Sequence, residues 1–88
     1  MSDYKVTFAR SARKDLERLS HRIADRILEK STALEKVPRP AAALKLKGES
    51  NLWRLRVGDY RVIYDIDDSK RIVDVTAIRH RREVYRDV

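Results

Sequence analysis

The chain has 88 residues, no cysteine and a net charge of +7, with 21 Lys and Arg against 14 Asp and Glu. This length predicts one domain over residues 1–88, and the lack of cysteine excludes disulfides, thiolate nucleophiles and cysteine-ligated zinc. The excess of positive charge favours a polyanionic partner, with nucleic acid ahead of a membrane surface. The N-terminus lacks a signal-peptide pattern and no segment has about 20 apolar residues, so a cytoplasmic protein is expected.

The first 40 residues predict a short strand and two helices. Residues 4–8 alternate and are rich in aromatic and β-branched side chains, which is typical of a strand. Apolar residues spaced three or four apart predict a helix over residues 10–19 and a second helix capped by Ser20 and ended by Pro38 and Pro40. The residues of the second helix that we expect to face the core are Ile23, Ile27, Leu28 and Leu34.

The remaining residues predict a linker and a set of strands. The linker spans residues 38–51, and one turn of helix is possible over residues 41–44. The apolar pattern then alternates, which predicts strands over residues 52–57, 60–66 and 72–78. The order β-α-α-β-β-β indicates an α+β fold, with the helical hairpin on one face of a mainly antiparallel four-stranded sheet.

The hairpin at Gly58-Asp59 fixes which side chains share a face. If these two residues form the loop, Val57 lies opposite Tyr60, and each step outward defines another pair. The core-side pairs would be Val57 with Tyr60, Leu55 with Val62, and Trp53 with Tyr64.

On the other face, Arg56 would lie opposite Arg61, with Arg54 beside them. Like charges directly opposite one another destabilise a sheet, so a merely solvated face would favour a different residue at one position. Guanidinium groups match phosphate oxygens in two places, which indicates a phosphate-binding surface. A basic face with no ligand is the alternative.

Further basic and aromatic residues follow the last strand. Arg79 shares alternation parity with the apolar Val73 and Val75, so either it lies beyond the covered part of the sheet or a β-bulge precedes it. Tyr85 could stack a base or transfer a proton, or simply pack the C-terminal residues. The residues that could add contacts to RNA are Lys45, Lys47, Arg81 and Arg82, which could equally be solvated.

Several of these segments together resemble the RelE/ParE toxin superfamily of type II toxin–antitoxin systems. They are residues 46–48, 53–56, 58–64 and 79–85, of which 58–64 (GDYRVIY) is the most specific. The superfamily contains ribosome-dependent mRNA endonucleases of the RelE branch and gyrase poisons of the ParE branch. The residues that match the RelE branch are Arg54, Arg56, Arg61, Arg79 and Tyr85.

The resemblance implies a metal-independent mRNA interferase without a cofactor. A ribose 2′-hydroxyl would attack its own 3′ phosphate in the ribosomal A site, with the arginines stabilising the extra negative charge. Arg79 is also a candidate for serving the leaving group. Family members often carry lysine on the second strand, whereas Arg54 and Arg56 stand there in this chain. The candidates for the general base are therefore Tyr85 and His80, with purely electrostatic catalysis or ribosomal groups as alternatives.

The implied partners are a cognate antitoxin, the ribosome and mRNA, with operator DNA bound only through the antitoxin. Three other functions remain open at this point. They are a ParE-like gyrase inhibitor without nuclease activity, a non-catalytic nucleic-acid-binding module, and a toxin of weakened activity.

Overall fold

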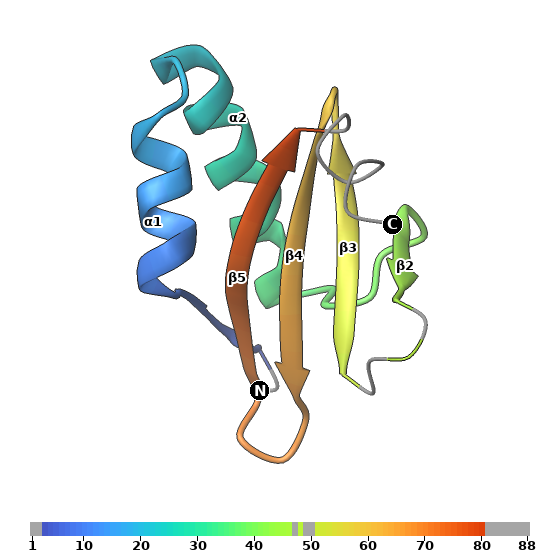
Figure 1. The fold of residues 1–88 in the computed structure, drawn as a ribbon. Coiled ribbons are helices and arrows are strands. Elements are labelled where there is room, and N and C mark those ends of the chain that lie inside the picture. The colour runs from blue at the N-terminus through green and yellow to red at the C-terminus, as the bar shows by residue number, and fades with distance from the viewer. Residues whose placement is uncertain (1–2, 47, 49–50, 81–88) are drawn as a thin grey trace.

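The computed structural model describes residues 3–46, 48 and 51–80 and contains two helices on a five-stranded sheet (Figure 1). In chain order the elements are β1 (Lys5–Phe8), α1 (Arg10–Glu17), α2 (His21–Thr32), the 3-10 turn η1 (Ala33–Glu35), β2 (Ala43–Lys45), β3 (Leu52–Val57), β4 (Tyr60–Asp67) and β5 (Ile72–His80). The predicted α+β fold is confirmed. None of the described helices is long and apolar enough to cross a membrane.

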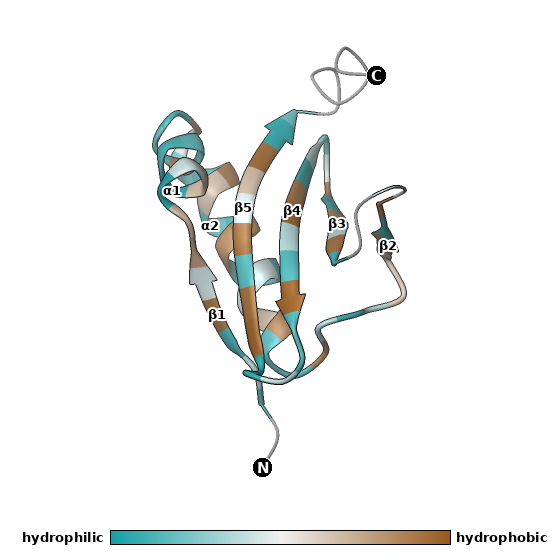
Figure 2. Cartoon of the chain, turned by 60° about the horizontal axis from the view of Figure 1, so that its bottom comes forward, coloured by the Kyte–Doolittle hydropathy of each residue, from teal (hydrophilic) through white to brown (hydrophobic). Residues whose placement is uncertain are grey.

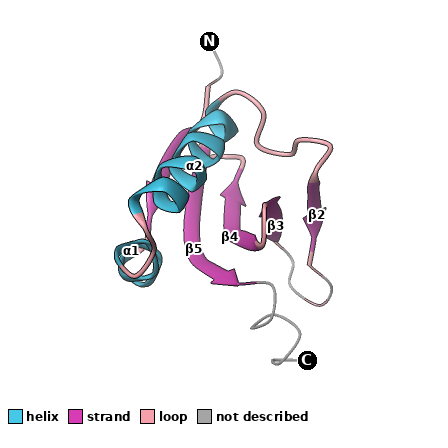
Figure 3. Ribbon diagram, turned by 90° about the horizontal axis from the view of Figure 1, so that it is seen from above, coloured by secondary structure: helices cyan, strands magenta, loops and turns pink. Residues whose placement is uncertain are grey.

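The sheet has the strand order β1-β5-β4-β3-β2. β1 runs parallel to β5, and every other neighbouring pair is antiparallel. Both helices lie on the same face of the sheet, and no helix of the described residues covers the opposite face (Figures 1 and 3).

The core lies between the helices and the inward side chains of the strands. Hydrophilic and hydrophobic residues alternate along β4 and β5, as Figure 2 shows. On β4 the buried residues of this pattern include Val62, Tyr64 and Ile66, and on β5 they include Val73 and Val75. One face of each strand is therefore apolar because it packs against the helices.

Ser20 caps α2 as its sequence predicts, since its hydroxyl accepts a hydrogen bond from the Ile23 amide at 3.4 Å. Ile27 and Leu34 are buried, and Ile23 packs against the core. The prediction for Leu28 was wrong, because its side chain is 38% exposed. Leu28 follows Ile27 directly and is turned about 100° from it around the helix axis, away from the buried stripe.

The linker contains a strand that the sequence did not predict. Residues 43–45 form β2, which pairs with Trp53–Leu55 of β3, instead of the turn of helix considered for residues 41–44. The sheet therefore has five strands rather than four. A three-residue edge strand has too few residues to show alternation, and its hydrogen bonds come from a neighbour that the local sequence does not reveal.

A polar cluster connects Arg39, in the linker before β2, to Asp68 in the turn between β4 and β5. Arg39 donates to both oxygens of Asp68, at 3.2 and 2.7 Å, and the Tyr4 hydroxyl donates to the same carboxylate at 2.6 Å. The guanidinium carbon of Arg39 also lies 5.4 Å from the ring centre of Trp53. The buried Tyr64 donates its hydroxyl to the Pro38 carbonyl at 2.8 Å. These contacts hold Pro38 and Arg39 against the sheet, a few residues before β2 begins.

Candidate active site

Three arginines lie side by side across three strands, on the face of the sheet away from the helices. Arg56 of β3 is the register partner of Arg61 of β4, and Arg61 is the register partner of Arg79 of β5. We call these three residues the arginine row. The hairpin register predicted from Gly58-Asp59 is confirmed at all three core-side pairs and at Arg56–Arg61.

A β-bulge brings Arg79 into this row. Tyr64 pairs with Val75 and Ile63 pairs with Ala77, so Thr76 is the extra residue on β5. The Thr76 hydroxyl donates to the Ile63 carbonyl at 3.3 Å. Beyond the bulge the alternation is reversed, and Arg79 shares the outward side of Arg61. Of the two explanations that the sequence left open, the bulge is the one that the structure supports.

The three guanidinium groups differ in burial. Arg61, in the middle, is only 5% exposed, whereas Arg56 is exposed and donates from Nε to the Gly58 carbonyl at 3.3 Å. The row is therefore a fixed concentration of positive charge with a desolvated centre, where an anion interacts more strongly than at an exposed lysine.

Arg79 is held by an acid that lies outside the sheet. Its Nη1 donates to Oδ2 of Asp15 on α1 at 3.1 Å, and the Ile78 amide donates to the same oxygen at 2.9 Å. Asp15 was not among the site residues predicted from the sequence.

The remaining predicted site residues are more dispersed. Arg54 is half-buried on the same face as the arginine row and lies opposite Ile63. Lys45 is the register partner of Trp53, so its side chain leaves the sheet on the helix side, away from Arg54. The predicted residues that lie outside the described part of the chain are Lys47, Arg81, Arg82 and Tyr85.

His80 is on the opposite side of the sheet from the arginine row. It is the register partner of Tyr60, and the two rings meet edge to face with their centres 5.1 Å apart. Tyr60 is a core-side residue that packs against the cluster under the helices. The structure therefore separates His80 from the arginines that precede it in the sequence.

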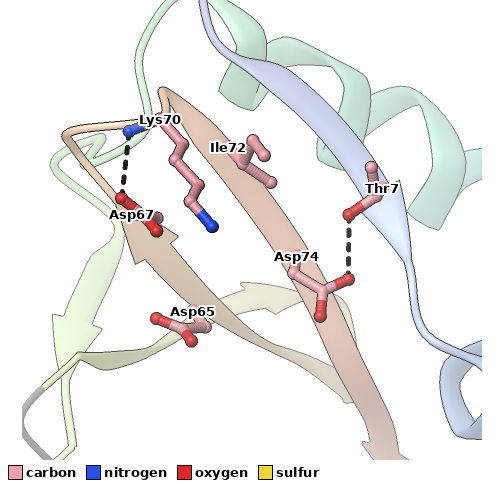
Figure 4. A pocket seen from close by; sticks show the side chains of 6 residues that line it. All are labelled: Thr7, Asp65, Asp67, Lys70, Ile72 and Asp74. Carbon is pink, nitrogen blue, oxygen red and sulfur yellow. Dashed lines mark hydrogen bonds between the residues drawn. The ribbon is translucent and has the colours of Figure 1, made fainter.

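The other end of the outward face is acidic. Asp65 and Asp74 are register partners, and with Asp67 they line a shallow pocket of about 350 Å³ (Figure 4). Thr7 donates its hydroxyl to Asp74 at 2.9 Å, and the Lys70 amide donates to Asp67 at 3.0 Å. That amide, together with the Ser69 hydroxyl, lowers the pKa of Asp67. The two ends of the outward face therefore differ in charge, with carboxylates at one end and the arginine row at the other.

The family model for the ParE toxin of type II toxin–antitoxin systems, parDE, matches residues 6–85. The chain is a toxin of this family. The toxin RelE of Mycobacterium tuberculosis is 36% identical over an alignment of 91 positions, which covers 98% of this chain and 93% of RelE. The toxin RelG of the same organism is 31% identical over 84 residues, which cover 94% of this chain and 97% of RelG.

Solved structures agree with the sequence comparisons. A chain of the Mycobacterium tuberculosis toxin–antitoxin complex RelBE2 superposes on this toxin with a TM-score of 0.81 at 32% identity. The match covers 90% of this toxin and 99% of that chain. The resemblance to the RelE/ParE superfamily, drawn from the sequence alone, is confirmed.

One signal in the toxin's sequence pointed toward Asp15. Ser11 and Asp15 are four residues apart on α1 and therefore share one side of the helix. Ser11 donates its hydroxyl to the Thr76 carbonyl at 2.6 Å, so both polar side chains meet β5 at or after the bulge. Such a spacing is common on solvated helices, and it is meaningful only once the strand beside it is known.

Proposed function

We propose that this toxin is a ribosome-dependent mRNA endonuclease, a single domain over residues 1–88 that inhibits translation in the cytoplasm. The observation that carries the proposal is the arginine row, with Arg61, a residue that is only 5% exposed, at its centre. A fold that needed only a soluble surface would not place like charges directly opposite one another on neighbouring strands.

The reaction would be the attack of a ribose 2′-hydroxyl on its adjacent 3′ phosphate, which leaves a cyclic phosphate and a 5′-hydroxyl. The phosphate gains negative charge as the new bond forms, and preorganised guanidinium groups stabilise that charge. Arg61 lies between Arg56 and Arg79, so its guanidinium is the best placed of the three to share a phosphate with a neighbour on either side. Arg54, on the same face, would extend the contact along the RNA.

The proton of the 2′-hydroxyl needs a base, and Tyr85 is our first candidate. A phenol among cations loses its proton more readily than a free one. His80 is the second candidate, but its ring faces Tyr60 on the helix side of the sheet. To reach RNA on the arginine row, His80 would have to leave that contact.

The ribosome would supply the geometry that this small sheet does not impose. In-line attack requires the 2′-oxygen, the phosphorus and the leaving oxygen to be aligned, and ordering of the message in the A site provides this alignment. Contacts of Lys47, Arg81 and Arg82 to RNA backbone would position the complex without reading its sequence. Lys45 leaves the sheet on the helix side, so it would contact ribosomal RNA there and not the message on the arginine row.

A cognate antitoxin would keep the activity in check. The similar chain of known structure comes from a toxin–antitoxin complex, which supports a partner of this kind. The outward face carries both the arginine row and an acidic end, so a binding segment with acidic residues would be attracted to the former. Operator DNA would be contacted only through the antitoxin.

Primer extension on a defined message in a purified translation system tests the proposal. Wild-type toxin should cut within A-site codons only when ribosomes are present, and Arg61→Ala should lower the rate by about 10² to 10³. Arg56→Gln, at an exposed position, repeats the test without opening a cavity in the sheet. Lys5→Ala removes a positive charge at the acidic end and should cut at the wild-type rate.

A gyrase inhibitor of the ParE type is the second candidate, because the family model that matches is that of ParE toxins. Such a toxin would leave the message intact in the same experiment and would block supercoiling by purified gyrase. Arg61→Ala separates the two readings if it abolishes one of these activities and spares the other.

A further inference from the structure

The carboxylate of Asp15 joins α1 to the end of β5 through one oxygen. Oδ2 accepts hydrogen bonds from the Ile78 amide at 2.9 Å and from Nη1 of Arg79 at 3.1 Å. The side chain of Asp15 is 18% exposed and that of Arg79 is 36% exposed. The ion pair is therefore partly shielded from water, where a charge-assisted hydrogen bond is stronger than at the surface.

Asp15 is fixed in place by contacts that do not involve Arg79. The parallel pairing of β1 with β5 ends at Phe8 and Val75, and beyond Val75 no strand among residues 3–46, 48 and 51–80 pairs with that edge of β5. Side chains of α1 take its place, because Ser11 bonds the Thr76 carbonyl and Asp15 bonds the Ile78 amide. The carboxylate is thus held by the backbone of the strand, and the Arg79 side chain is the part that adapts to it.

The contact uses only one corner of the guanidinium group. Nη1 donates to Asp15 and makes a longer contact of 3.5 Å with the Ile78 carbonyl. Among the residues that the structure describes, Arg79 makes no hydrogen bond through Nε or Nη2. These two donors form one of the edges with which a guanidinium binds two oxygens of a phosphate.

The position of Arg79 in the row explains why an acid is needed there. Its neighbour Arg61 carries the same charge, and repulsion would drive an unrestrained Arg79 side chain outward into solvent. A flexible arginine would lose side-chain entropy on meeting a phosphate, whereas a restrained one has already lost it.

We propose that Asp15 is a positioning residue for the phosphate chemistry of the arginine row. It holds Arg79 by Nη1 and leaves Nε and Nη2 to bind the RNA phosphate next to Arg61. This inference rests on the proposed nuclease function. It assigns to α1 a role in orienting a guanidinium group of the arginine row.

The variant that tests this role is Asp15→Asn, which removes the negative charge that attracts Arg79. It keeps an oxygen that can accept from the Ile78 amide, but a neutral oxygen binds the Arg79 guanidinium more weakly than a carboxylate does. The maximal cleavage rate at saturating ribosome–message complex should fall by about 10-fold to 100-fold, with an unchanged half-saturating concentration. Glu17→Gln is the matched control, because Glu17 is an exposed carboxylate on the same helix. Its cleavage rate should equal that of the wild type.

A double-mutant cycle separates positioning from a general loss of stability. In the background of Arg79→Ala, the change Asp15→Asn should lower the rate no further, because there is no guanidinium left to orient. An equal fold-loss in both backgrounds would overturn the proposal, since Asp15 would then act on the fold alone. An Asp15→Asn toxin that cuts at the wild-type rate or faster would also overturn it, since the carboxylate would then be neutral or a competitor of the phosphate.

Nitrogen NMR of the arginine side chains gives a readout that does not depend on cleavage. Restricted rotation should give Arg79 separate Nη signals in the wild type, and Asp15→Asn should merge them. A single averaged signal in the wild type would overturn the inference while leaving the nuclease proposal standing. Distinct signals together with an uncut message would instead overturn the nuclease function, and the positioning role of Asp15 with it.

Discussion

Arg79 lies directly opposite Arg61 across β4 and β5, on the face that the helices leave open. Without the bulge at Thr76, the alternation that buries Val73 and Val75 would turn Arg79 toward the core. Because of the extra residue, the Ile78 side chain is buried on the helix side of the sheet. Its neighbour Arg79 therefore points outward and belongs to the arginine row. A single backbone irregularity thus decides whether the row has two members or three.

Replacing Arg56 by Thr should stabilise the fold and impair cleavage. Arg56 and Arg61 are like charges on directly opposed positions, so the substitution should raise the free energy of unfolding by about 0.5 kcal/mol at low salt. The control is Arg54→Thr on the same strand, which faces Ile63 and should show no such gain. Urea denaturation at two salt concentrations measures the stability of both variants, and primer extension measures their cleavage of the message. Equal gains for the two variants would mean that the Arg56–Arg61 pair is not under electrostatic strain.

Substitutions of Gly58 should test the hairpin that sets the register. Gly58 has a φ of +59°, a backbone conformation that residues other than glycine adopt at a cost in free energy. No atom lies within 4 Å of a Cβ added at this position. Gly58→Ala should therefore lower the free energy of unfolding by about 1 kcal/mol through the backbone alone, and Gly58→Asn by less. Thermal denaturation orders the two variants. A larger loss for Gly58→Asn would contradict this account of the turn.

The stability of the toxin should decline at alkaline pH because of Tyr64. Burial raises the pKa of Tyr64 to about 12, above the value of about 10 in an unfolded chain. The folded state keeps a proton that the unfolded state releases between these values, so the free energy of unfolding falls as the pH rises through this window.

Tyr64→Phe should flatten that decline and should lower stability at neutral pH by about 1 kcal/mol, since the bond to the Pro38 carbonyl is lost. Denaturant titrations from pH 7 to pH 11 measure both effects. Parallel pH profiles for the two proteins would show that another group is responsible for the alkaline loss.

Low pH should weaken the ion pair between Arg39 of the linker and Asp68 in the turn between β4 and β5. Hydrogen bonds from Arg39, and secondarily from Tyr4, lower the pKa of Asp68. A lowered folded pKa stabilises the folded state above the unfolded value of about 3.9, and this stabilisation is lost as the pH falls below it.

Asp68→Asn should accordingly be less stable than the wild type at pH 7 and should lose less on acidification. Asp25→Asn, which removes an exposed carboxylate on α2, is the control and should follow the wild-type profile closely. Circular dichroism against pH distinguishes them. If Asp68→Asn lost as much on acidification as the wild type, the ion pair with Arg39 would contribute nothing in solution.

The general base can be assigned by comparing two variants. Tyr85→Phe should slow cleavage more than His80→Ala, because His80 packs against Tyr60 on the side away from the arginine row. Single-turnover cleavage on programmed ribosomes, followed against pH, gives both rates. Near-normal cleavage by Tyr85→Phe, with loss of cleavage in His80→Ala, would reverse the assignment.

The sequence predicted the helical hairpin, the three long strands and the pairing of Arg56 with Arg61. These features depend on local signals, namely the 3.6-residue and two-residue periodicities, the cap at Ser20 and the tight turn at Gly58. Once a two-residue loop is placed between alternating strands, the register of a hairpin follows by counting. The resemblance to a toxin family then came from residues in and beside that hairpin.

Only the tertiary structure decided β2, the bulge at Thr76 and the contact of Asp15 with Arg79. Each depends on hydrogen bonds to another segment of the chain, and Asp15 bonds the Ile78 amide 63 residues later. A periodic pattern records which side chains avoid water, but not which backbone group lacks a partner at a strand edge. The sequence therefore determined which arginines exist on the outward face of the hairpin, and packing of α1 against β5 decided how the last of them is held.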